Sequence, residues 1–97
     1  MDYKIFWTEE AIHNLEEIVD YLRFKWTEKE VENFKAKLSR QIDLISTNPT
    51  MFPISSHVPR LRKAVLSKQT SIFYEIQDSH IYLAYLWIHK KDIGKMK

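Results

Sequence analysis

The spacing of the apolar residues changes twice along the chain. Residues 3–7 alternate in a composition rich in β-formers and predict a strand. From Ile12 to Trp26, apolar residues recur in steps of three and four with acidic residues between them, which predicts an amphipathic helix. A second stripe of this kind, from Val31 to Ile45, predicts a second helix. Strand compositions then return in residues 62–66, 71–77 and 81–88.

The ends of both helices carry local signals. Thr8 precedes two glutamates and is typical of an N-cap with acidic residues in the first turn. Thr27, with Glu30 three residues later, forms a capping box that separates the two apolar stripes. All three prolines lie in residues 48–60, which we expect to be an ordered loop. Met51 and Phe52 should return from it to the core.

These elements predict an α+β fold. An N-terminal strand leads into an antiparallel helix hairpin, and a three-stranded antiparallel meander then completes a small four-stranded sheet. The last strand is apolar or aromatic on both faces, because alternation places one set of side chains opposite another: Ile81, Leu83, Tyr85 and Trp87 against Tyr82, Ala84, Leu86 and Ile88. Because helices cover only one face, we expect a partner protein to cover the other near Tyr74, Tyr82 and Tyr85.

Length and composition limit the possibilities further. With 97 residues, 44% of them hydrophobic, the chain is expected to form one globular domain over 1–97. The absence of cysteine excludes disulfides and thiolate metal sites. The N-terminus has no apolar signal region, and no stretch approaches the length of a membrane span. We therefore expect a cytoplasmic protein.

Charge is distributed unevenly along the chain. Residues 1–59 carry seven Lys and Arg against ten Asp and Glu, whereas residues 60–97 carry eight against three. This asymmetry indicates either a basic face for an anionic partner or lysines that protect sheet edges.

The sequence lacks the residue patterns that most catalytic mechanisms require. The four histidines show no metal-ligand spacing, no serine lies in a glycine elbow, and a single glycine excludes a phosphate loop. We expect no metal and no cofactor. One basic group could stabilise the cleavage of RNA by its own 2′-hydroxyl, which needs a base, an acid and cations. Its members are Arg60, Arg62, Lys63, Lys68, Tyr74, His89, Lys90 and Lys91.

Several segments together resemble a known family. They are WTEEAIHNLEEIVDYLRFKW, the helix end LISTNPTMFP, LRKAVL, SIFYEI and the closing WIHKKDI. Over essentially the whole chain, this pattern is similar to the RelE and ParE toxins of bacterial type II toxin–antitoxin modules, some of which stabilise plasmids. The resemblance implies growth inhibition, an antitoxin whose C-terminal segment wraps the toxin, and contact with DNA only through the antitoxin complex.

The resemblance leaves two targets open. RelE-like toxins cleave mRNA on the ribosome and are therefore endoribonucleases, whereas ParE-like toxins inhibit DNA gyrase. A RelE-like reading implies the catalytic residues Lys63, Tyr74, His89 and Lys90, but the C-terminal tail has no tyrosine. The closing His89, Lys91, Asp92 and Ile93 are similar to the end of ParE-like chains, which favours gyrase.

The sequence also suggests which residues contact the target and the antitoxin. We expect the target to be bound by Arg60, Arg62, Lys68, Lys91 and Asp92, and the antitoxin by Tyr74, Tyr82 and Tyr85. A non-toxic interaction module with the same fold is a further alternative.

Overall fold

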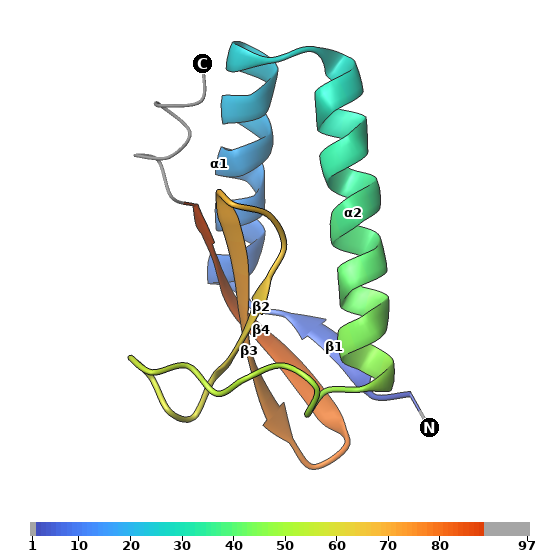
Figure 1. Ribbon diagram of the computed structural model, residues 1–97, viewed down its shortest axis with the longest axis vertical. Helices are drawn as coiled ribbons and strands as arrows, with labels where there is room; N and C mark the ends of the chain where they lie inside the picture. The colour runs from blue at the N-terminus through green and yellow to red at the C-terminus, as the bar shows by residue number, and fades with distance from the viewer. Residues whose placement is uncertain (1, 89–97) are drawn as a thin grey trace.

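A computed structural model describes residues 2–88 and has the expected order of elements (Figure 1). Within this part of the chain, no helix is both long and apolar enough to cross a membrane. The elements are β1 (Lys4–Trp7), α1 (Glu9–Lys25), α2 (Glu28–Thr47), β2 (Arg62–Val65), β3 (Thr70–Gln77) and β4 (His80–Ile88). The predicted α+β fold is therefore confirmed.

The four strands form one mixed sheet in the order β1-β4-β3-β2. The meander β2-β3-β4 is antiparallel, while β1 pairs with β4 in parallel. Asp78 makes the tight turn between β3 and β4 with a φ of 56°, a left-handed conformation that aspartate tolerates better than most residues. The N-terminal strand therefore lies at one edge of the sheet and β2 at the other.

Both predicted helix N-caps are present. The hydroxyl of Thr8 accepts the backbone N–H of Ala11 at 3.1 Å, and that of Thr27 accepts the N–H of Glu30 at 3.3 Å. Each bond satisfies one of the N–H groups that the first helical turn leaves unpaired. Only residues 26 and 27 separate the two helices, so the chain reverses at once.

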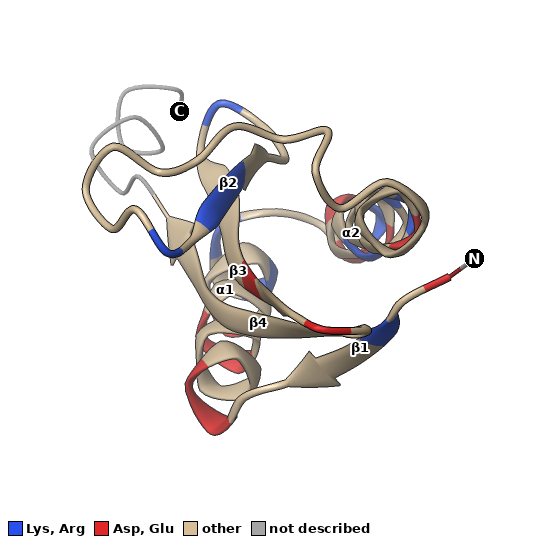
Figure 2. Cartoon of the chain, turned by 90° about the horizontal axis from the view of Figure 1, so that it is seen from below, with Lys and Arg blue, Asp and Glu red and all other residues tan. Residues whose placement is uncertain are grey.

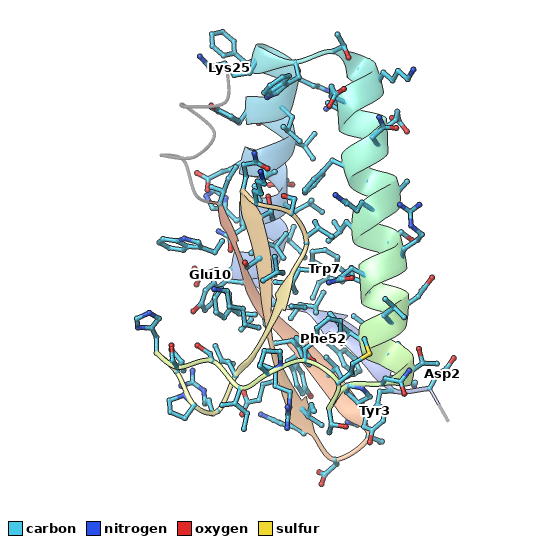
Figure 3. All side chains as sticks on the ribbon, viewed as in Figure 1. Asp2, Tyr3, Trp7, Glu10, Lys25 and Phe52 are labelled. Atoms are coloured by element: carbon cyan, nitrogen blue, oxygen red, sulfur yellow. The ribbon has the colours of Figure 1, made fainter. Side chains whose placement is uncertain are left out.

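Side chains from both helices and one face of the sheet form a single core. We call this face of the sheet the helix-covered face. Phe52 packs against the core, as expected, whereas Met51 is 53% exposed, so that part of the loop prediction was wrong. Trp7 and Phe52 lie between the strands and α2 in Figure 3. The buried members of the core are Ala11, Ile18, Leu38, Ile45, Ala64, Leu66, Ile72, Tyr74, Ile81, Leu83 and Leu86.

Strand β4 contains an irregularity that the sequence analysis did not predict. Tyr85 pairs with Phe73 and Leu83 pairs with Tyr74, which leaves Ala84 without a partner in β3. One extra residue reverses the alternation, so Leu83 and Leu86 both enter the core. The expectation that Tyr85 and Trp87 share a face with Leu83 was therefore wrong.

Helix α1 fixes this bulge where β1 ends. The Thr8 hydroxyl donates to the carbonyls of Leu83 and Ala84, at 2.7 and 3.0 Å. Six residues later, the Asn14 side chain accepts the N–H of Leu86 at 3.0 Å. Thr8 at the N-cap and Asn14 within α1 thus replace the strand neighbour that β4 lacks beyond Trp7.

We expect Asn14→Ala to lower the free energy of unfolding by about 1–3 kcal/mol, because it leaves the N–H of Leu86 without its acceptor. Chemical denaturation measures the change. Glu16→Ala, an exposed position on the same helix, should change stability by about 0.5 kcal/mol or less. Equal effects of the two substitutions would argue against this account of the bulge.

Candidate functional site

The sheet face opposite the helix-covered face has no neighbouring element among the described residues. We call it the outer sheet face. It exposes 40% of Phe6, 58% of Val65 and 53% of Trp87. Among its residues are Lys4 and Phe6 on β1, His80, Tyr82, Tyr85 and Trp87 on β4, Phe73 and Glu75 on β3, and Lys63 and Val65 on β2. This is the surface for which the sequence predicts a partner.

Aromatic rings on the outer sheet face stack on one another across the strands. Phe6 and Tyr82 have ring centroids 5.3 Å apart, and Phe73 and Tyr85 have centroids 4.7 Å apart. The Lys63 ammonium lies 5.9 Å from the Phe73 ring, within cation–π range. Because these rings already stack on one another, they offer less of their faces to nucleic-acid bases. The outer sheet face is therefore better suited to a protein partner than to base stacking.

Tyr74 does not belong to the outer sheet face. It pairs with Arg62, one residue away from the Lys63–Phe73 pair, and so points to the opposite side. The side chain is fully buried, and its hydroxyl donates to the carbonyl of Pro49 at 2.6 Å. The expectation that Tyr74 lies beside Tyr82 and Tyr85 was therefore wrong, while those two residues do lie on the outer sheet face.

Burial also changes the acidity of Tyr74. Loss of solvent around the ring raises the pKa of its hydroxyl from 10.0 to about 12, although the nearby Arg62 guanidinium acts in the opposite direction. At neutral pH the phenol stays protonated and bonded to Pro49. Such a group is poorly suited to act as a general base.

The raised pKa of Tyr74 predicts a loss of stability in alkaline solution. The folded state holds the Tyr74 proton more tightly than the unfolded state does. The protonated hydroxyl therefore makes its full contribution to the free energy of unfolding below pH 10, and this contribution disappears as pH rises towards 12. We expect the free energy of unfolding to fall more steeply between these values in the wild type than in Tyr74→Phe. Chemical denaturation across this range measures both slopes. Parallel profiles would show that Tyr74 does not couple its ionisation to folding.

Arg62 serves the loop that follows α2. Its guanidinium donates to the carbonyls of Phe52 at 2.7 Å and Thr50 at 3.4 Å. Pro53 accepts the N–H of Lys63 at 2.9 Å, so the loop also pairs with the free edge of β2. Arg62 is one of the residues predicted to contact the target, but its guanidinium forms its hydrogen bonds with this loop.

Among residues 2–88, the other predicted basic residues do not converge. Arg60 is exposed, with its Nε 3.9 Å from a carboxylate oxygen of Glu75. Lys68 is exposed in the turn at the opposite end of β2. Figure 2 shows basic positions along β2, in the loop before it and in the turn after it. His89, Lys90, Lys91 and Asp92 lie outside the described residues.

A groove that the sequence analysis missed lies between the two helices and the end of the sheet. Its volume is about 560 Å³. The groove is lined by Ile18, Leu22, Trp26, Glu30, Asn33, Phe34, Ala36, Lys37, Arg40, Ser67, Gln69, Thr70 and Ile88. A signal was present, because the apolar stripes of the helices continue over more turns than the strands can cover. Among residues 2–88, no three His, Asp or Glu side chains are placed to hold a metal ion.

Comparisons with known proteins agree with this architecture. The family model described as ParE toxin of type II toxin-antitoxin system, parDE, matches residues 5–93. Searching curated protein sequences gives no match.

Solved structures from three toxin–antitoxin systems are similar in fold. A chain of the chromosomal ParDE system from P. aeruginosa has a TM-score of 0.76 and 17% identity, covering 89% of this chain and 95% of its own. A chain of the RelBE2 complex from Mycobacterium tuberculosis has a TM-score of 0.63 and 14% identity, covering 91% of this chain and 99% of its own. A chain of the E. coli DinJ-YafQ complex has a TM-score of 0.61 and 11% identity, covering 94% of this chain and 97% of its own.

Proposed function

Because the chain belongs to the ParE toxin family of type II toxin–antitoxin systems, we propose that it arrests bacterial growth by binding DNA gyrase and that a cognate antitoxin neutralises it. In this proposal the protein acts in the cytoplasm as an inhibitor and not as an enzyme. The outer sheet face would supply the contact surface, with Lys63 and Arg60 at its rim.

The placement of Tyr74 supports inhibition over RNA cleavage. An RNA-cleaving site needs a proton-transfer group and cations around one phosphate. Tyr74 and Lys63 lie on opposite faces of the sheet, and the Tyr74 hydroxyl is engaged by Pro49. Among the described residues, the tyrosine and lysine of the predicted catalytic set therefore do not share a site.

Two assays with the purified protein test the target. We expect inhibition of gyrase supercoiling at stoichiometric concentrations, and intact mRNA after incubation with translating ribosomes. Expression in cells should induce a DNA-damage response. Codon-positioned mRNA cuts, with unaffected supercoiling, would contradict the proposal and favour a ribosome-dependent ribonuclease. Inactivity in both assays would favour a non-toxic interaction module.

We expect Lys63→Ala to weaken gyrase inhibition by no more than about fivefold, because a rim lysine contributes about 1 kcal/mol or less to a protein interface. Dose–response curves for supercoiling measure the change. Lys35→Ala, an exposed position on α2, is the matched control and should behave as the wild type. Complete loss of activity in a folded Lys63→Ala protein would indicate a catalytic lysine instead.

A further inference from the structure

The groove exists because the helix hairpin is longer than the sheet beneath it. Figure 1 shows both helices continuing well past the turn between β2 and β3 and the end of β4. Among the described residues, no strand lies beneath the apolar stripes beyond that point. Trp26 remains 38% exposed, and Leu22, Phe34 and Ile88 are only half-buried. Exposed apolar surface of this kind marks an interface.

The dimensions of the groove match a short helix. Its lining along α2 runs from Glu30 to Arg40, which spans about 15 Å at 1.5 Å per residue. A guest helix of about ten residues, or three turns, covers that length. Helices bind such grooves through apolar residues spaced three and four apart.

Charge determines what kind of helix fits. Lys37 and Arg40 line the groove on α2, and neither forms an ion pair with another of residues 2–88. They lie three residues apart and therefore on the same side of the helix. Among the described residues of the lining, Glu30 is the only acidic one. The groove thus presents two cations beside an apolar floor formed by Leu22, Trp26 and Phe34.

We propose that Lys37 and Arg40 determine which antitoxin this toxin accepts, by pairing with carboxylates on an amphipathic antitoxin helix that places its apolar side on Trp26 and Phe34. This inference rests on the proposed function only for the existence of an antitoxin. The chain's own residues 89–97 are a poorer match, because four lysines against one aspartate would bring like charge to Lys37 and Arg40.

Charge reversal tests the proposal. The binding partner is the purified antitoxin encoded by the neighbouring reading frame, titrated against the full-length toxin. We expect K37E/R40E to weaken binding by at least about tenfold, because the desolvated charge pairs become repulsive. The matched control K29E/K35E has the same net charge and the same helix, but its positions do not line the groove. It should weaken binding by less than about threefold.

Compensation in the antitoxin gives the sharper readout. Replacing the carboxylates of its toxin-binding helix with lysine should restore affinity for K37E/R40E and reduce affinity for the wild type. A merely destabilised toxin would not recover in this way. If both double variants bind equally well, or if Trp87→Ser on the outer sheet face weakens binding while K37E/R40E does not, the proposal is wrong.

The failure of this inference is distinguishable from failure of the proposed function. Gyrase inhibition by K37E/R40E should equal that of the wild type, because the groove lies away from the outer sheet face. A toxin that does not inhibit gyrase but shows the predicted charge-swap pattern would contradict the proposed target alone. Normal gyrase inhibition without the charge-swap pattern would contradict the groove assignment alone.

Discussion

Leu38→Ala is expected to lower the free energy of unfolding by about 2–5 kcal/mol. Leu38 lies in the middle of α2, is 5% exposed and belongs to the core formed by both helices and the sheet. Removing its branched side chain loses the transfer free energy of the buried carbons and leaves a cavity that neighbouring residues only partly fill. For a chain of 97 residues, this is a large fraction of the usual stability.

Chemical denaturation of the purified variant measures this loss. Ser39→Ala is the matched control, since it changes the next, exposed residue of the same helix and should alter stability by about 0.5 kcal/mol or less. Toxicity of Leu38→Ala should fall in cells because less folded protein is present. An unchanged denaturation midpoint would contradict the assignment of Leu38 to the core.

The order of elements was predictable because its signals are local. A threonine before an acidic turn caps a helix through its own hydroxyl, as Thr8 and Thr27 do, and needs no distant contact for recognition. The apolar stripe of α2 likewise predicted Val31, Leu38 and Ile45, which are all buried. These features depend on residues within a few positions of each other.

The side chains of β3 and β4 were harder to place, because register depends on contacts between distant segments. The bulge at Ala84 arises where β1 ends, and the side chains of Thr8, the N-cap of α1, and of Asn14 bind the edge of β4 instead. Nothing near Ala84 in the sequence signals those partners. An alternation extended through the bulge therefore grouped Tyr85 and Trp87 with Leu83, from which the extra residue separates them.

The described members of the candidate site do not come together, for a related reason. The expected pairing of adjacent antiparallel strands grouped Arg62, Lys63 and Tyr74, but neighbouring residues of a strand point to opposite faces. Arg62 and Tyr74 thus share the helix-covered face and hold the loop after α2, while Lys63 lies on the outer sheet face. The groove between the helices also depends on a distant feature, because the surplus length of the apolar stripes has meaning only once the end of the sheet is known.

Tyr74→Phe provides the largest contrast between the two proposed targets. The substitution keeps the ring in the core but removes the hydroxyl that donates to Pro49. We expect the free energy of unfolding to fall by about 1–3 kcal/mol, because the carbonyl of Pro49, itself a buried residue, loses its donor. Activity per folded molecule should be unchanged, since the hydroxyl faces the interior and not a target.

A ribonuclease that used Tyr74 for proton transfer would behave differently. Loss of a general acid or base typically costs 10²–10⁴-fold in rate, and that cost would persist at temperatures where the variant is fully folded. The measurement is therefore gyrase inhibition and ribosome-dependent mRNA cleavage by Tyr74→Phe, each normalised to the folded fraction. Cleavage by the wild type that disappears in Tyr74→Phe would place this hydroxyl at a reacting phosphate. Gyrase inhibition of equal strength in both proteins would agree with a phenol whose only function is to hold the loop after α2 against the sheet.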